Sequence, residues 1–293
     1  MSFLVASALA ALTTATPAHR LVSGDSVIVS TEWLASHLAD PALIVLAVDQ
    51  KDSAYKAGHI AGARYLAFSD VIAQRNGLAQ ELPSVADLRA VLERLGVSTS
   101  SRVVVYGFPL IASRAFLALE YVGLNVSMLD GGLAKWTREG HPVTSELLRV
   151  SAGHLEPHVR TNVVDADWVR ARLGEGHRGV ALIDTRTDSE YEGTGERHMM
   201  PSDGHLSGAR RLPWEELFAT PNEGLFRHRA ELAKLYADRT QPGDTVVTYC
   251  YVGYRASMTY LVARYLGYTA RLYDGSYQDW SQRHLPLVAG KSP

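Results

Sequence analysis

The chain contains a single cysteine, Cys250, in 293 residues. One cysteine excludes an intramolecular disulfide and any metal site built from several cysteines. The 29 basic and 31 acidic side chains give a net charge of −2, and they form no basic run that would favour nucleic acid as a partner. A glycine-rich dinucleotide turn, a phosphate-binding loop and a metal-ligand spacing are also missing, so the sequence predicts neither a cofactor nor a metal.

Long hydrophobic runs are absent as well, and the apolar stretch at residues 3–15 is too short for a membrane span. The following Thr-Pro-Ala at 16–18 resembles a signal-peptide cleavage site, although no Lys or Arg precedes it. We interpret residues 1–23 as a leader or signal peptide. We favour a periplasmic or otherwise exported protein, with an uncleaved leader on a cytoplasmic protein as the alternative.

The sequence contains an internal repeat. The heptapeptide GHIAGAR at 58–64 returns as GHLSGAR at 204–210. Five further pieces return in the same order: 103–106 as 246–249, 112–113 as 256–257, 121–123 as 265–267, 130–132 as 274–276, and Trp136 as Trp280. One matched peptide would be chance, but six in one order indicate a tandem duplication. The halves run over 24–143 and 160–293, with a linker at 144–159 and about ten extra residues around 192–201 in the second copy.

Short apolar strands alternate with helical segments in both halves. In the second half we expect strands at 180–184, 245–249 and 270–273, and helices at 168–173, 229–238 and 256–266. This alternation predicts an α/β fold of two tandem domains, each a mostly parallel sheet flanked by helices. Ligands of such sheets bind beyond the carboxyl ends of the strands. Cys250 directly follows one of these ends.

The surroundings of Cys250 favour a reactive thiol. The residues before it form the predicted strand Thr245–Tyr249, and the predicted helix Ala256–Leu266 ends before Gly267. Backbone N–H groups of the intervening loop and the positive end of the helix dipole both favour a thiolate, which is the nucleophilic form. The alternative is an inert buried cysteine. Arg255, which closes the loop, favours the reactive thiol.

The same pieces resemble the tandem-domain rhodanese family of thiosulfate and 3-mercaptopyruvate sulfurtransferases. The resemblance rests on Asp184-Thr185-Arg186 with Glu190, on residues 204–209, on Tyr249-Cys250, on Arg255-Ala256-Ser257, and on 273–276 ahead of Trp280. It covers nearly the whole chain after residue 24, and it implies an inactive first half and a catalytic second half. Gly107 occupies the position of Cys250 in the first half, and we expect Gly107→Ala to leave turnover nearly intact.

The resemblance also implies which residues surround an accessible Cys250 and its persulfide. The substrate-binding residues would be Arg186, Arg255, Tyr251, Val252, Gly253 and Tyr254, with Gly253 permitting the turn of the loop. The two arginines would line the mouth as cations. Alternatively, Arg255 pairs with Glu190 or Asp184, and Arg186 pairs with Glu190.

Two acidic residues and one histidine are expected to have structural roles. Asp184 would tie the backbone of the cysteine loop, and Glu190 would support the arginines. His205 is a tempting general base, but its counterpart His59 persists in the inactive half. We therefore interpret His205 as a residue that packs a turn.

Taken together, the resemblance predicts a sulfurtransferase whose partners are a small-molecule sulfur donor and an acceptor. We expect Cys250 to take the outer sulfur of thiosulfate and pass it to cyanide, a thiol or a protein acceptor. Thiosulfate-preferring loops of the family resemble Cys-Arg-Lys-Gly and mercaptopyruvate-preferring ones resemble Cys-Gly-Ser-Gly, whereas Tyr251 and Val252 fill these positions here. The alternatives are 3-mercaptopyruvate as the donor, a persulfide carrier or binding module, and a phosphatase, whose Cys-x5-Arg loop would be one residue longer.

Overall fold

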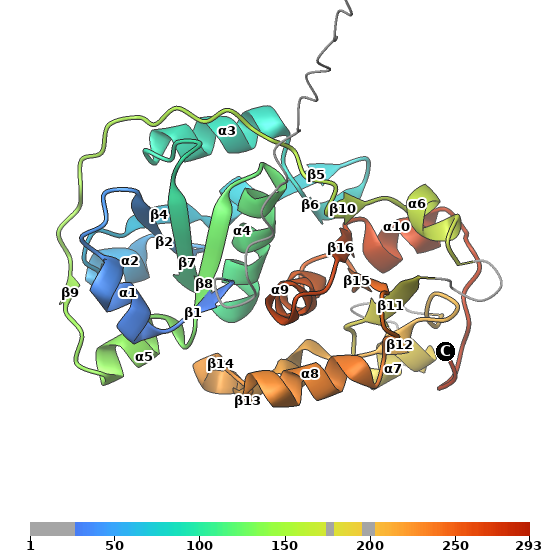
Figure 1. Cartoon of the computed structure of the whole chain (residues 1–293). Coiled ribbons are helices and arrows are strands. Elements are labelled where there is room, and N and C mark those ends of the chain that lie inside the picture. Colours follow the sequence, from blue (N-terminus) through green and yellow to red (C-terminus); the bar gives the residue numbers. More distant parts are fainter. Residues whose placement is uncertain (1–26, 174–178, 195–202) are drawn as a thin grey trace, which may run out of the picture.

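The computed structural model describes residues 27–173, 179–194 and 203–293. The predicted leader at 1–23 and most of the extra segment around 192–201 lie outside the described residues. Figure 1 shows two α/β domains packed side by side, which confirms the predicted fold class. Within the described ranges, no helix has the length and apolar character needed to cross a membrane.

The first domain is built on a parallel sheet in the order β1-β8-β7-β2-β4. Its strands are β1 (Ile28–Val29), β2 (Leu43–Asp49), β4 (Arg64–Ala67), β7 (Arg102–Gly107) and β8 (Asn125–Leu129). Its helices are α1 (Thr31–His37), α2 (Ser53–Ala57), α3 (Val85–Arg94), α4 (Pro109–Tyr121) and α5 (Gly132–Arg138), with a 3-10 turn η2 (Phe68–Val71). Two short antiparallel pairs complete it: β3 (His59–Ile60) with β9 (Val143–Thr144), and β5 (Ala73–Arg75) with β6 (Leu78–Glu81).

The second domain repeats this topology in the strand order β10-β16-β15-β11-β12, which is also parallel. Its strands are β10 (Val163–Val164), β11 (Val180–Asp184), β12 (Arg210–Arg211), β15 (Thr245–Tyr249) and β16 (Ala270–Tyr273). Its helices are α6 (Ala166–Arg170), α7 (Asp188–Glu192), α8 (Arg229–Ala237), α9 (Ala256–Leu266) and α10 (Ser276–Gln282), with 3-10 turns η3 (Trp214–Leu217) and η4 (Pro221–Glu223). A hairpin pairs β13 (Phe218–Thr220) with β14 (Leu225–Phe226).

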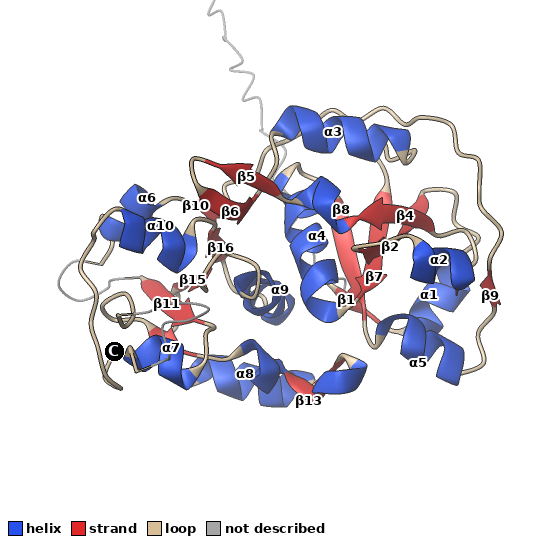
Figure 2. Cartoon of the chain, turned by 180° about the vertical axis from the view of Figure 1, so that it is seen from behind, coloured by secondary structure: helices blue, strands red, loops and turns tan. Residues whose placement is uncertain are grey.

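Both faces of each sheet are covered, because side chains alternate along the buried strands. On β2, Leu46 and Val48 pack in the cluster that contains α3 and α4, whereas Ala47 packs with residues of α1, α2 and α5. Figure 2 shows these helix layers from behind. The near-continuous apolar character of the central strands therefore reflects burial on both faces.

The two domains share one apolar core. The cluster on the inner face of the first sheet continues through α4 and α9 to the inner face of the second sheet. Helix α4 is buried around its whole circumference, from Pro109 to Glu120, as expected of a helix enclosed between a sheet and a second domain. At its end, Glu120 accepts an ion pair from Arg264 of α9 at 2.9 Å and a hydrogen bond from the Tyr260 hydroxyl.

Each domain also holds the other through a hairpin. The backbone N–H of Leu82, next to β6, donates to the carboxylate of Asp274 at 2.7 Å. In the mirrored contact, the N–H of Phe226 in β14 donates to Asp130 at 3.2 Å. Figure 1 shows the β5–β6 hairpin beside β16 and α10, and the β13–β14 hairpin beside α5. Since Asp130 and Asp274 are repeat equivalents, the duplicated turn forms the same contact twice.

A buried arginine reinforces one of these contacts. Arg114 of α4 has no exposed side-chain surface, pairs with Asp274 at 2.7 Å and donates to the backbone carbonyl of Gln80. Burial and the nearby charge of Asp274 raise the pKa of the neighbouring Glu81 carboxyl to about 7.

Breaking the Arg114–Asp274 pair should weaken the interface between the domains. We expect Arg114→Met to lower the free energy of unfolding by about 3–5 kcal/mol, because it leaves a buried carboxylate without its cation. Urea denaturation measures the change. The matched control is Arg138→Met, which removes the exposed Arg138–Glu223 pair across the same interface and should cost less than about 1 kcal/mol. Equal losses in the two variants would contradict this interpretation.

Candidate active site

Cys250 lies where the sequence places it, at the carboxyl end of β15. This strand covers Thr245–Tyr249 and α9 covers Ala256–Leu266, both with the predicted bounds. Gly267 caps α9 in the left-handed region at φ 94°. The residues between strand and helix form a tight loop at the edge of the sheet, which is the expected place for a ligand site in an open parallel sheet.

Backbone contacts hold this loop against α10 and α9. The carbonyls of Cys250 and Tyr251 accept the N–H groups of Tyr277 at 3.0 Å and Gln278 at 2.9 Å. The Ser257 hydroxyl donates to the carbonyl of Gly253 at 3.0 Å. Gly253 has a φ of 76°, and a Cβ there would lie 2.7 Å from the carbonyl oxygen of Asp274. Only glycine fits this position, because of both the dihedral angle and the close approach.

The thiol itself is fully buried. Cys250 has 0% exposed surface and belongs to the apolar core shared by the domains. The expectation of an accessible thiol is therefore wrong for this conformation. In this conformation Cys250 packs with the buried apolar residues of the core that the two domains share.

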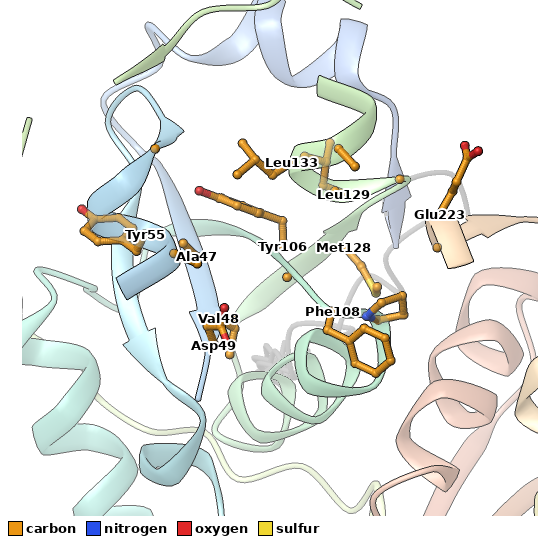
Figure 3. Close-up of a pocket in the computed structure, with 18 residues that line it drawn as sticks. Ala47, Val48, Asp49, Tyr55, Tyr106, Phe108, Met128, Leu129, Leu133 and Glu223 are labelled. Carbon is orange, nitrogen blue, oxygen red and sulfur yellow. The ribbon is translucent and has the colours of Figure 1, made fainter. Parts of the chain in front are cut away.

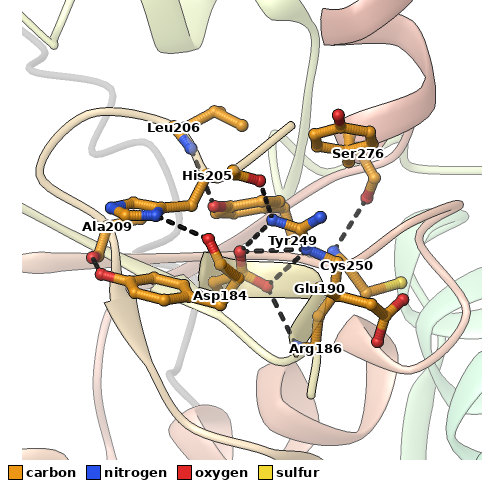
Figure 4. Close-up of polar contacts among 12 residues, drawn as sticks. Asp184, Arg186, Glu190, His205, Leu206, Ala209, Tyr249, Cys250 and Ser276 are labelled. Carbon is orange, nitrogen blue, oxygen red and sulfur yellow. Dashed lines mark hydrogen bonds and ion pairs between the residues drawn. The ribbon is translucent and has the colours of Figure 1, made fainter. Parts of the chain in front are cut away.

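Ser276 is a site residue that the sequence analysis missed. Its hydroxyl accepts the N–H of Cys250 at 3.2 Å and donates to the carbonyl of Tyr273 at 2.8 Å. Figure 4 shows it beside Cys250. Ser276 has a φ of 51°, a region that favours glycine, and its repeat equivalent Gly132 has a φ of 50°. The exchange of glycine for a strained serine in the cysteine-bearing copy was the available signal.

Arg255 closes the loop and is held by Glu190. The two side chains form a bidentate ion pair with distances of 2.7 and 2.8 Å. Burial raises the pKa of the Glu190 carboxyl, but the hydrogen bonds and charge of Arg255, together with Thr187, outweigh burial and lower it to about 2. Burial likewise lowers the pKa of Arg255, whereas Glu190 and the charge of the nearby Cys250 raise it above its usual value. Of the two alternatives for Arg255, the structure contains the ion pair.

Arg186 does not line the mouth of the site, so this expectation is wrong. Its guanidinium is fully buried and pairs with Asp184 at 2.7 Å. It also donates to the carbonyl of Gly204 at 2.8 Å and lies over the ring of Tyr277, 4.4 Å from its centre. Asp184 accordingly holds Arg186, and its carboxylate also interacts with Tyr249, the residue before Cys250. The reason is the turn after β11, where the Arg186 N–H also bonds to Asp184 and directs the side chain inward.

The remaining loop side chains are half-buried. The Tyr251 ring lies 5.6 Å from that of Tyr277, and Val252 is next to it in the loop. The Tyr254 ring packs 5.4 Å from Phe68, which belongs to the first domain. The first domain therefore forms part of the wall around the cysteine loop.

His205 has a structural environment. Its ring stacks on Tyr191 at 3.6 Å, and its two ring nitrogens lie 2.9 and 3.0 Å from the carbonyl oxygens of Tyr191 and Ser292. His59 repeats the stack with Tyr55 at 3.8 Å. This confirms that the histidine packs a turn. Among the described residues, no group of three His, Cys, Asp or Glu side chains could hold a metal ion.

Gly107, the equivalent of Cys250, is more constrained than expected. It has a φ of 156°, and a Cβ would lie 2.2 Å from the carbonyl oxygen of Val48. Gly107→Ala would therefore force the backbone of the first domain to move, whereas its small effect on turnover stays a prediction. The backbones of the two copies have diverged at the point where the second copy has Cys250 and the first has glycine.

Comparison with known proteins identifies the family of both domains. The rhodanese-like domain matches residues 30–139 and 165–283, one copy in each half. The chain belongs to the rhodanese family. Its relatives in the rhodanese family include the sulfur carrier protein TtuD of Thermus thermophilus, 33% identical over 290 residues that cover 90% of this chain and 97% of TtuD. Another is the thiosulfate sulfurtransferase of Corynebacterium glutamicum, 32% identical with coverage of 90% and 91%.

Solved rhodanese structures have the same fold. SseA from Escherichia coli, described as a 3-mercaptopyruvate sulfotransferase, superposes with a TM-score of 0.74 at 24% identity, over 86% of this chain and 99% of SseA. Wild-type EanB superposes with a TM-score of 0.79 at 22% identity, over 94% of this chain and 71% of EanB. The chain is accordingly a sulfurtransferase of the rhodanese family, within which the named relatives differ in substrate.

Replacing Glu190 should impair turnover by releasing Arg255. Glu190→Gln keeps the shape of the side chain but removes the charge that fixes the guanidinium. We expect turnover to fall about 100-fold, as for a site group displaced by roughly 1 Å, measured by steady-state kinetics. Asp188→Asn is the control on the same helix, because Asp188 forms an exposed pair with Arg211. Turnover of Glu190→Gln at the wild-type rate would show that the pair has no role in the reaction.

Ser276 can be tested by two substitutions that separate strain from hydrogen bonding. Both Ser276→Gly and Ser276→Ala remove the acceptor for the Cys250 N–H, so both should lower turnover. Both variants can keep the positive φ, but only alanine has a Cβ that makes this φ strained. The glycine variant should therefore be more stable than the alanine variant by about 1 kcal/mol. Thermal unfolding and kinetics of the two variants provide the comparison. Wild-type turnover in Ser276→Gly would exclude a positioning role for the hydroxyl.

Proposed function

We propose that this protein transfers the sulfane sulfur of thiosulfate to cyanide or a thiol through a persulfide on Cys250. The observation that supports this most strongly is the position of Cys250 at the start of a loop closed by Arg255, directly after the carboxyl end of β15. Successive N–H groups of such a loop form an anion-binding concavity. The N-terminus of α9 adds positive potential at the same place.

The proposed reaction has two steps. The Cys250 thiolate attacks the outer sulfur of thiosulfate, an S–S bond forms to Cys250, and the S–S bond of the donor breaks to release sulfite with the bonding electron pair. The acceptor then attacks the outer sulfur of the persulfide and restores the thiolate, so that cyanide leaves as thiocyanate. This sequence requires ping-pong kinetics. Because Cys250 is buried in the present conformation, the loop or its neighbours have to move before the donor can reach the sulfur.

The ion pairs bear on the choice of donor. Arg186 and Arg255 are each paired with a carboxylate, so the loop N–H groups become the main ligands of a doubly charged thiosulfate. The 32% sequence identity with the thiosulfate sulfurtransferase of Corynebacterium glutamicum supports thiosulfate as the donor. The alternative is 3-mercaptopyruvate, which carries a single carboxylate charge and makes smaller demands on cations. A persulfide carrier with a protein acceptor is a third possibility, suggested by the likeness to a sulfur carrier protein.

The decisive assay is thiocyanate formation from cyanide with thiosulfate or 3-mercaptopyruvate as the donor. We expect faster turnover of thiosulfate, complete loss in Cys250→Ser, and a mass increase of one sulfur atom on wild-type protein treated with thiosulfate alone. Faster turnover of 3-mercaptopyruvate would reverse the donor assignment but keep the mechanism. Sequential kinetics, or activity retained in Cys250→Ser, would contradict the persulfide mechanism.

A further inference from the structure

The first domain has a cavity at the position that corresponds to the cysteine site of the second. It has a volume of about 270 Å³ and lies at the carboxyl ends of β2, β7 and β8 (Figure 3). Gly107, the equivalent of Cys250, lines it together with the backbone of Gly131 and Gly132. Glu223 and Gly224 of the second domain complete the wall. The cavity is therefore bounded by both domains.

Loss of polar side chains accounts for the empty space. Ala54 precedes Tyr55 as Glu190 precedes Tyr191, so an alanine lines the cavity where the second domain has the Glu190 carboxylate. Ala112-Ser113 match Ala256-Ser257, so Ile111 stands at the position of Arg255, and its side chain is buried in the shared core. The bidentate ion pair that fills this region in the second domain thus has no counterpart in the first.

The walls are apolar and aromatic. Tyr55, Tyr106, Met128, Leu129 and Leu133 surround the interior. At the rim, Phe108 is 55% exposed and adds apolar surface to the entrance of the cavity. An apolar cavity of about 150 Å³ is large enough for benzene. The volume here suits a molecule of one or two rings.

The charged groups at the cavity disfavour an anion. None of the 18 lining residues is a lysine or arginine, whereas Asp49 and Glu223 contribute carboxylates. Glu223 is neutralised by Arg138 at 2.7 Å. Asp49 uses one oxygen to accept the N–H of Gln50. A carboxylate beside aromatic faces attracts a positively charged or neutral ring system and repels a negative one.

We propose that this first-domain cavity binds a small aromatic molecule that carries no negative charge. Its ligand class is therefore different from that of the cysteine site, which is organised for anions. Both domains line the cavity, and Gly224 packs so closely on Pro109 that a Cβ at Gly224 would lie 2.7 Å from the proline ring. A ligand that contacts both walls would therefore also stabilise the contact between the domains.

Three probes with one ring system and different charges test this proposal. Isothermal titration calorimetry of the full chain with indole, tryptamine and indole-3-acetate compares a neutral, a positive and a negative ligand. We expect indole and tryptamine to bind, and tryptamine to bind about tenfold more tightly than indole-3-acetate. No binding of indole or tryptamine at millimolar concentration overturns the proposal, and so does binding of tryptamine no tighter than that of indole-3-acetate.

Variants locate the binding. Ala54→Leu places a larger side chain in the cavity from an exposed position of α2, and Phe108→Ser removes the apolar rim. Both should weaken tryptamine binding and leave sulfurtransferase turnover unchanged. Ala57→Leu, on the same short helix but outside the lining, is the matched control. Cys250→Ser should bind the probes as the wild type does. Unaltered tryptamine binding in both Ala54→Leu and Phe108→Ser overturns the proposal.

Discussion

The carboxylate of Asp274 connects the two domains to the cysteine loop. It accepts an ion pair from Arg114 and the N–H of Leu82, both from the first domain. The backbone of Asp274 lies so close to Gly253 that no side chain fits there. The conformation of the cysteine loop therefore depends on a residue that the first domain holds in place. The first domain, which has no cysteine, thus has a physical role, which is to fix the turn against which the cysteine loop packs.

Because the two domains are copies of one sequence, their equivalent positions can be compared one by one. Three of the positions that differ have a small residue in the first copy: Cys250 against Gly107, Glu190 against Ala54, and Ser276 against Gly132. In the second domain these residues carry the thiol, hold Arg255 and anchor the Cys250 backbone. In the first domain the same positions are small, and a cavity with apolar walls lies beside them. Backbone strain also differs between the copies. The same left-handed φ is adopted by Gly132 in the first domain, where it costs little, and by Ser276 in the second, where it is strained.

Local patterns predicted the fold well because they reflect local physics. The apolar strand Thr245–Tyr249 and the helix Ala256–Leu266 with its glycine cap were predicted with the observed bounds. The site was predicted less completely. Arg186 was expected at the mouth, but a turn that binds Asp184 directs it inward. Ser276 was missed because it contacts Cys250 from 26 residues away in the sequence. Arg114 was missed because its partner, Asp274, lies in the other domain.

The sequence by itself determined the duplication, the strand–helix order, and the position of the single cysteine after a strand of the second copy. These features follow from residue spacing, hydrophobic periodicity and the chemistry of one side chain. Only the tertiary structure decided which charges pair, that the thiol is buried, and that a cavity occupies the equivalent place in the first domain. Those outcomes depend on the distances between residues far apart in the chain, because the free energy of an ion pair or a cavity is set by its neighbours in space.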